Sequence, residues 1–137
     1  MAAEDPKGRK ILVVDDEPEI TGSLQEILEQ AGYAVETAQD GREALEKSRT
    51  FLPGLILLDV MMPKMDGFQV LEHLKKEGQT ANIPVIMLTS RAGARDLEEG
   101  IQQHVEKYFS KPFDGVSLLA EIKKAFAVRR DSGAAFL

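Results

Sequence analysis

The sequence contains no cysteine and no long hydrophobic run, and each absence excludes a class of protein. Without cysteine there is neither a disulfide framework nor a thiolate metal site. The start of the chain is polar and includes Pro6 and Gly8, so it shows neither a secretory signal nor a membrane anchor. A basic stripe is also missing, and the formal net charge of −6 argues against non-specific binding to nucleic acid. We therefore expect a cytoplasmic protein with no direct nucleic-acid binding and no membrane insertion.

Length and hydrophobic content indicate one domain. The chain has 137 residues, of which 43% are hydrophobic, and this suffices for a single full core. Neither an internal repeat of solenoid period nor a low-complexity segment interrupts it. We expect residues 10–128 to form the domain, after a disordered segment over 1–9 and before a short C-terminal tail over 129–137.

Short aliphatic runs alternate with amphipathic stretches along the chain. The runs indicate strands, and apolar residues recurring every three or four positions indicate helices. The expected strands are 10–15, 33–38, 55–58, 84–89 and 107–110. The expected helices are 18–31, 41–49, 68–76, 94–104 and 114–128, of which 94–104 has the thinnest apolar face. Right-handed crossovers between such units predict an α/β fold, in which a parallel sheet carries helices on both faces.

Reactive polar residues stand where four of the five expected strands end. Asp15 and Asp16 follow the first strand, Asp59 the third, Thr89 the fourth and Lys111 the fifth. In open parallel sheets, ligands bind just outside the carboxyl ends of the strands. Each residue also has an ordinary alternative. The acids can cap the turns or helices that follow them, Thr89 can be a β-branched strand end, and Lys111 a solvated surface lysine.

The three acids together suggest a divalent cation. If the first and third strands are neighbours, Asp15, Asp16 and Asp59 converge, and like charges so close raise one another's proton affinity unless a cation lies between them. Mg²⁺ prefers oxygen ligands and keeps several waters. Two carboxylates and one backbone carbonyl would therefore leave positions open for a phosphoryl group. Convergence of the acids favours a metal site over simple capping.

The same edge of the sheet holds the groups that phosphoryl transfer requires. A carboxylate can act as a nucleophile towards phosphorus, and the transferred group spreads negative charge over its equatorial oxygens. Mg²⁺ can bind one of these oxygens, the Thr89 hydroxyl can donate to a second, and the Lys111 ammonium can hold the third. The bond between Lys111 and Pro112 could be a cis peptide that aims the lysine at the site.

Four motifs in order resemble the receiver domains of two-component response regulators (CheY-like). They are Val-Val-Asp-Asp-Glu-Pro at 13–18, Leu-Leu-Asp-Val-Met-Met-Pro-Lys-Met-Asp-Gly at 57–67, Ile-Met-Leu-Thr-Ser at 86–90 and Tyr-Phe-Ser-Lys-Pro-Phe at 108–113. The resemblance spans 10–128, nearly the whole chain. It implies a doubly wound, flavodoxin-like sheet of five strands in the order 2-1-3-4-5.

The resemblance also implies a role for each residue of the site. Asp59 would accept a phosphoryl group from a histidine kinase or a histidine phosphotransfer protein. Mg²⁺, or Mn²⁺ in its place, would be held directly by Asp16, Asp59 and the carbonyl of Met61, and by Asp15 mainly through water. Lys111 would hold the phosphoryl group. The domain would accept this group on its own aspartate and assist its removal, and so would not be a turnover enzyme.

Thr89 and Tyr108 match the switch pair of the family. In receivers the threonine moves towards the phosphoryl group, and the aromatic side chain turns inward into the space it leaves. This is a population shift between two packings. It implies a downstream protein effector, met by a monomer or by a phosphorylation-dependent dimer. Without the resemblance, Tyr108 could equally be an edge-strand aromatic that only packs.

Other classes share parts of the pattern. An FMN-binding flavodoxin-like protein has this fold, but its first loop cradles phosphate with Ser, Thr and Gly, and the acids at 15–17 would repel it. A haloacid-dehalogenase-type phosphatase needs Asp-x-Asp, and the motif at 59–61 lacks the second acid. We expect a stand-alone single-domain regulator, which the Met1 start and the short tail favour. The alternatives are a receiver excised from a larger DNA-binding regulator or hybrid histidine kinase, and a pseudo-receiver that binds partners without phosphorylation.

Overall fold

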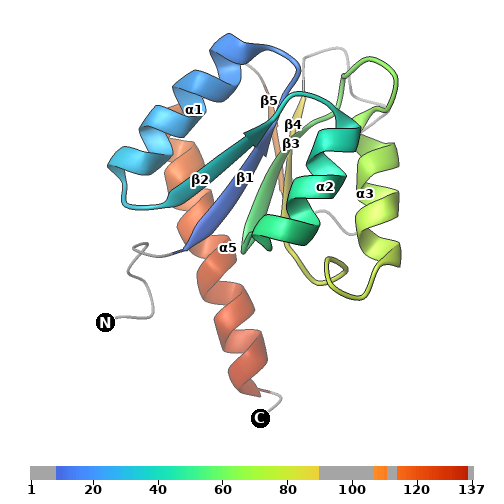
Figure 1. Cartoon of the computed structure of the whole chain (residues 1–137). Helices are drawn as coiled ribbons and strands as arrows, with labels where there is room; N and C mark the ends of the chain where they lie inside the picture. The colour runs from blue at the N-terminus through green and yellow to red at the C-terminus, as the bar shows by residue number, and fades with distance from the viewer. Residues whose placement is uncertain (1–8, 90–106, 111–113, 136–137) are drawn as a thin grey trace.

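The computed structural model describes residues 9–89, 107–110 and 114–135, and five parallel strands form its sheet. The sheet has the order β2-β1-β3-β4-β5 (Figure 1). Its strands are β1 (Lys10–Val14), β2 (Ala34–Ala38), β3 (Leu55–Asp59), β4 (Val85–Thr89) and β5 (Lys107–Ser110). The expected fold class, strands and strand order are confirmed.

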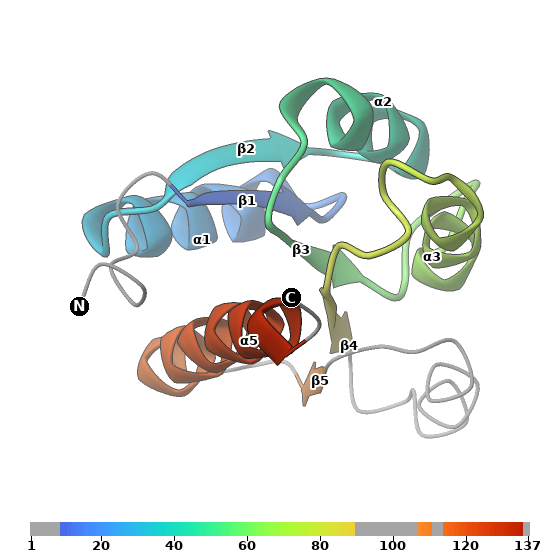
Figure 2. The ribbon, with the colours of Figure 1, turned by 90° about the horizontal axis from the view of Figure 1, so that it is seen from below.

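Helices cover both faces of this sheet. Figure 2 shows α1 and α5 on one face and α2 and α3 on the other. The helices are α1 (Pro18–Gln30), α2 (Gly41–Phe51), α3 (Gly67–Lys76) and α5 (Gly115–Ala135). None of them combines the length and the apolar character needed to cross a membrane. The helix expected over 94–104 lies outside the described residues.

The end of α5 differs from the sequence-based expectation. We predicted that this helix would end at Val128, followed by a tail, but it continues to Ala135 and passes beyond the edge of the sheet in Figure 1. The prediction was wrong because it ended the helix where the apolar periodicity ends, near Phe126. Beyond that point no proline stops the helix, which runs through the weaker helix formers Asp131, Ser132 and Gly133 between a pair of arginines and a pair of alanines.

The core forms two layers because successive side chains of a strand point to opposite faces. One layer packs β1 and β3 against α2 and α3, through Leu12, Val14, Ile56, Leu58, Phe68, Leu71 and Leu74. The other packs the same strands against α1 and α5, through Ile11, Val13, Leu55, Leu57, Leu24, Leu118 and Ile122. Every residue of β3 is buried, so the central strand is covered on both faces as its aliphatic run predicted.

Local signals explain where the helices begin. Pro18 starts α1 with its preset backbone angle. Asp66 caps α3 in a capping box with Gln69, because each side chain bonds the other's backbone N–H. Asp114, which precedes α5, accepts from the N–H of Ser117 at 3.2 Å. These caps orient the loops at the carboxyl edge of the sheet, where the predicted site residues lie.

Candidate functional site

The sheet order makes β1 and β3 neighbours, which is the condition on which the metal hypothesis depended. Val14 pairs with Leu58, so the residues that come next, Asp15 and Asp59, follow side by side. Adjacent strands of a sheet lie about 4.8 Å apart. Both side chains are buried, with exposed fractions of 0% and 3%. The sheet therefore sets the backbones of these two buried acids side by side at its carboxyl edge.

The loop after β1 brings further acids to this edge. Carboxylate oxygens of Asp15, Asp16 and Glu17 lie within 4.8 Å of one another, and the last two side chains reach solvent. These are hard oxygen donors, the kind that Mg²⁺ and Mn²⁺ bind, so the residues present fit such a cation. The sequence reasoning did not count Glu17 among the ligand candidates. The signal was available, because Glu17 is the third consecutive acid after a buried strand.

One oxygen of each buried acid closes the turn that follows it. Oδ1 of Asp15 accepts from the N–H of Glu17 at 3.0 Å, and Oδ1 of Asp59 accepts from the N–H of Met61 at 3.2 Å. Aspartate side chains typically accept such hydrogen bonds from the backbone N–H of the residue two positions later in the chain. The capping alternative is thus partly correct, and it does not exclude the chemical one. A carboxylate has a second oxygen, and the turn bond fixes the direction in which the side chain points.

Hydrogen bonds from β2 and α1 hold the acidic loop in place. The N–H of Asp15 donates to the carbonyl of Ala38 at the end of β2, over 3.1 Å. The Gln39 amide then donates to the Thr21 hydroxyl at 3.1 Å, and that hydroxyl donates to the carbonyl of Pro18 at 3.1 Å. Thr21 is only 3% exposed. Sequence reasoning missed this tie, because no local pattern relates Gln39 to Thr21.

The loop after β3 packs closely against the strand end that carries Asp59. The N–H of Gly67 donates to the carbonyl of Val60 at 2.9 Å. A Cβ atom on Gly67 would lie 2.9 Å from the Cα of Val60 and would also meet the carbonyl oxygen of Asp59. The loop can approach so closely because glycine has no Cβ atom. Met61 lies in the same loop, and its side chain is 60% exposed beside the acids.

The remaining predicted residues are placed only in part. By register, Thr89 lies opposite Ser110 and Tyr108 opposite Met87, so the two positions of the predicted switch stand on neighbouring strands. The structure describes the backbone of Thr89 and Tyr108 and not their side chains. Lys111, with its bond to Pro112, lies outside the described residues. The roles of these three residues stay predictions.

A comparison with protein families matches this chain to one of them. The family of the response regulator receiver domain matches residues 11–123. Among curated proteins, the alkaline phosphatase synthesis transcriptional regulatory protein PhoP of Bacillus subtilis is 44% identical over 115 residues, which cover 84% of this chain and 47% of the relative. The chain thus spans about half the length of the curated relatives it matches.

Solved structures agree in fold over nearly their full length. The chemotaxis response regulator CheY4 of Vibrio cholerae superposes with a TM-score of 0.79 and 35% identity, covering 85% of this chain and 98% of that one. The signal receiver domain of a histidine kinase from Syntrophus aciditrophicus superposes with a TM-score of 0.81 and 34% identity, covering 88% and 91%.

Proposed function

The chain belongs to the family of response regulator receiver domains, and from this premise we propose that Asp59 is its phosphoacceptor. Receiver domains of two-component systems work with histidine kinases. The observation that carries the proposal is the pairing of β1 with β3, which sets the buried Asp15 beside the buried Asp59 at the edge where parallel sheets bind ligands.

The proposed step forms one bond and breaks one. A carboxylate oxygen of Asp59 attacks phosphorus, the bond from phosphorus to a histidine nitrogen of the donor breaks, and its electron pair stays on that nitrogen. The product is an aspartyl phosphate, so the chain is itself the substrate and does not turn over. The turn bond from Met61 to Asp59 holds the nucleophile in one orientation during this step.

We propose that Asp16, Asp59 and the carbonyl of Met61 hold Mg²⁺ directly, with Asp15 acting through water. When bound, the ion supplies positive charge to the phosphoryl oxygens. Carboxylate oxygens of Asp15 and Asp16 lie within 4.8 Å of each other, which supports a cation shared by both residues. Glu17 belongs to the same group of oxygens, and we expect it to strengthen attraction of the cation to the edge.

For the readout we propose Thr89, Tyr108 and Lys111. Thr89 and Lys111 would hold phosphoryl oxygens, and Tyr108 would turn inward as Thr89 moves. The support is positional, since Thr89 ends β4 at the edge that carries Asp59, and Ser110, the residue before Lys111 in the sequence, ends β5 at the same edge. The altered packing would change the affinity for a protein effector, either in a monomer or through a phosphorylation-dependent dimer.

Two roles remain open for the whole protein. A stand-alone regulator fits the match to CheY4, whose chain is covered almost completely. A receiver within a longer regulator or hybrid kinase fits PhoP, in which the matched part is about half of the chain. The mass of the natural protein, detected in extracts of its source with an antibody against this domain, would separate the two.

Incubation with acetyl phosphate tests the phosphoacceptor directly. We expect intact-mass spectrometry to show one phosphoryl adduct that needs Mg²⁺ and that is absent from Asp59→Asn. Asp66→Asn is the matched control, because Asp66 lies in the same loop and only caps α3. An adduct that persists in Asp59→Asn would refute the assignment. Failure of both acetyl phosphate and histidine kinases to modify the native chain would instead support a pseudo-receiver.

A further inference from the structure

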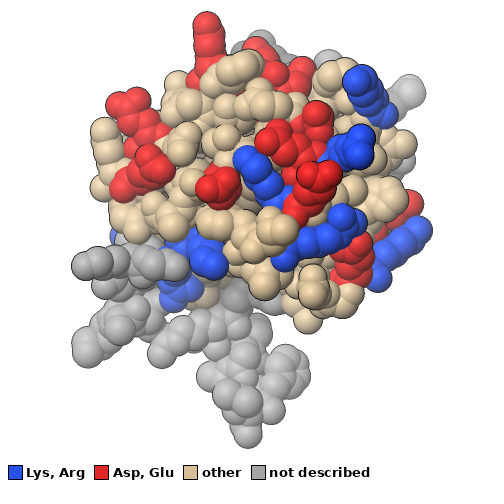
Figure 3. Space-filling view, viewed as in Figure 1, with Lys and Arg blue, Asp and Glu red and all other residues tan. Residues whose placement is uncertain are grey.

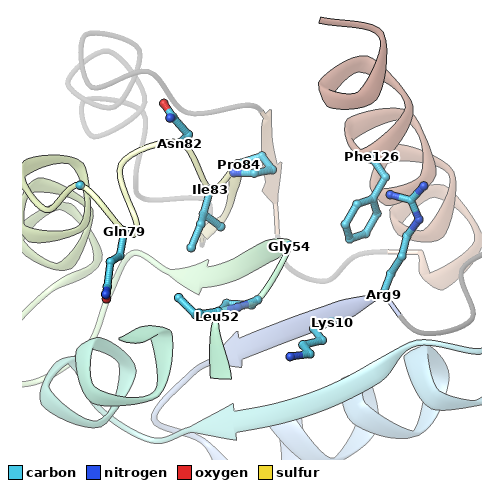
Figure 4. A pocket seen from close by; sticks show the side chains of 11 residues that line it. Arg9, Lys10, Leu52, Gly54, Gln79, Asn82, Ile83, Pro84 and Phe126 are labelled. Carbon is cyan, nitrogen blue, oxygen red and sulfur yellow. The ribbon is translucent and has the colours of Figure 1, made fainter. Parts of the chain in front are cut away.

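A hollow of about 730 Å³ lies at the amino ends of the strands, at the edge of the sheet opposite the acids (Figure 4). Three parts of the chain form it: the start of β1, the connection from α2 to β3, and the loop before β4, with Phe126 of α5 closing one side. Its volume is in the range of ligand sites on proteins. None of these residues belongs to the site around Asp59.

The lining of the hollow differs in charge from the chain as a whole. Among the residues that the structure describes, Arg9 and Lys10 line it and no Asp or Glu does, although the net charge of the chain is −6. The space-filling view also shows basic side chains at this lower edge, near the start of β1 (Figure 3). A cationic hollow on an acidic protein attracts an anionic partner more strongly than the rest of the surface does.

Aromatic rings fix the position of both cations. The Arg9 guanidinium lies 4.7 Å from the centre of the Phe126 ring, and the Lys10 ammonium lies 5.3 Å from the centre of the Phe51 ring. Lys10 also donates to the carbonyl of Phe51 at 3.2 Å. These contacts hold the charges at the rim and so reduce the entropy that binding would otherwise cost.

Between the cations and the far end, Leu52, Ile83 and Pro84 supply apolar surface. Leu52 stands out because it exposes 51% of its surface and adopts a left-handed conformation, with φ of 50°. Leu52 is the C-cap of α2, a position that often takes this conformation and that glycine fills at no steric cost. Figure 4 shows the side chains in their spatial order across the hollow. Arg9 and Phe126 lie at one end, Lys10, Leu52 and Ile83 lie in the middle, and Asn82 and Gln79 lie at the other end.

We infer that this hollow docks a short acidic peptide segment of a partner protein. A carboxylate of the segment lies against Arg9 and Lys10, an apolar side chain packs on Leu52 and Ile83, and the amide of Gln79 bonds the peptide backbone. The hollow is open, so an extended segment can lie across it. Since it faces away from Asp59, docking does not depend on the phosphoacceptor, and a partner can remain bound while Asp59 is modified.

Titration with a defined peptide, followed by ¹H–¹⁵N NMR of the whole chain, tests the inference. The probe is acetyl-Asp-Glu-Leu-Asp-Leu-amide, and the control is the same peptide with lysine at every acidic position. We expect saturable shifts of the amides of Leu52, Gly54 and Gln79 with the acidic peptide only. No saturable shift, equal shifts with the basic peptide, or shifts confined to other regions would overturn the inference.

Two variants separate docking from folding. Lys10→Glu should raise the dissociation constant of the acidic peptide about fivefold, which is the effect of one partly exposed ion pair. Arg42→Glu makes the same charge change on α2 and should leave binding of the peptide unchanged. Leu52→Gly should raise the melting temperature by removing the left-handed strain and yet weaken binding by removing the apolar contact. If Leu52→Gly binds as tightly as the native chain, Leu52 is not part of a docking site.

One further outcome would identify a different occupant. Concentration-dependent shifts of the same amides without any peptide would show that a second copy of this chain, which is acidic, fills the hollow. That result would overturn the inference of a peptide from a partner protein. Sedimentation of the native chain over the same concentrations supplies the independent measurement.

Discussion

At the residue scale, the acids act in more than one way. Asp15 and Asp59 each use one oxygen to close a turn, and this bond orients the carboxylate rather than occupying it fully. Gly67 contributes by having no side chain, because the loop after β3 can approach the backbone of Asp59 only without a Cβ atom. Orientation and close packing both restrict the positions that the Asp59 side chain can take.

Replacing Gly67 tests this packing. In Gly67→Ala the new Cβ would clash with the backbone of Asp59 and Val60, and overpacking of this kind costs about 1–3 kcal/mol. Gly22→Ala is the matched control, since a Cβ atom there meets nothing within 4 Å. Alanine at an exposed position within a helix should stabilise the fold by about 0.5–1 kcal/mol relative to glycine. Urea unfolding measures both. Equal stability of Gly67→Ala and the native chain would contradict the packing argument.

Because the phenol of Tyr33 is partly buried, we expect the protein to lose stability at alkaline pH. Burial raises the pKa of its phenol above the ordinary 10.0, and the charge of Arg9 offsets this only in part. As the pH rises, the unfolded state therefore loses the proton of Tyr33 before the folded state does. The contribution of Tyr33 to the free energy of unfolding is fully present below the pKa of the unfolded state and is lost as the pH rises through the pKa of the folded state.

Urea unfolding between about pH 9 and pH 11 measures this loss. The control is Tyr33→Phe, which keeps the ring stacked on Phe126 at 5.8 Å and removes the titrating group. We expect the variant to lose less stability than the native chain over this range. The same slope in both proteins would show that the Tyr33 phenol does not titrate differently on unfolding.

At the scale of elements, the acidic loop depends on its neighbours. The tie from Gln39 through Thr21 to Pro18 joins the end of β2 to the first turn of α1, and the loop with Asp15 and Asp16 lies between these two elements. Bonds of this kind fix the backbone of a loop that would otherwise sample several conformations. We therefore expect the tie to position the ligands for a cation without touching it.

Removing the hydrogen bond from Gln39 to Thr21 should lower the affinity for a cation strongly and the stability of the fold only slightly. In Gln39→Leu we expect the dissociation constant for Mg²⁺, measured by calorimetry, to rise about tenfold, the lower end of the range for residues that support metal ligands. Gln25→Leu is the control, since Gln25 bonds only Glu29 on the exposed side of α1 among the contacts described. Native affinity in Gln39→Leu would exclude a positioning role, and Mg²⁺ binding by the native chain would still stand.

At the scale of the whole molecule, the two edges of the sheet differ in charge. Acids gather where the strands end, and Arg9 and Lys10 stand where β1 begins. The parallel arrangement produces this separation, because all strands point the same way and residues after them collect at one edge. The acids at one edge repel one another, and a bound divalent cation would reduce this repulsion.

Mg²⁺ should therefore stabilise the whole fold. A ligand that binds only the folded state adds about 2.7 kcal/mol when its concentration is a hundred times its dissociation constant. We expect the urea midpoint to rise with MgCl₂ and not with NaCl of equal ionic strength, and the rise to shrink in Asp16→Asn. An equal rise in Asp16→Asn and the native chain would place the cation elsewhere.

Patterns of the sequence alone determined the fold class, the strands and the helix starts. The aliphatic run at 55–58 predicted a strand, and the apolar spacing after Pro18 predicted a helix, because such periods act between residues a few positions apart. The end of α5 at Ala135 was missed, since the helix continues after the apolar pattern has stopped and no proline ends it.

Tertiary structure decided what lies beside what. The contact of Gln39 with Thr21, the place of Arg9 over Phe126 and the neighbouring positions of Asp15 and Asp59 all join residues far apart in the chain. Such contacts follow from strand order and register, and no local period encodes them. The sequence alone could therefore name the acids of the site, whereas only the folded sheet could bring them together and form a cationic hollow at its opposite edge.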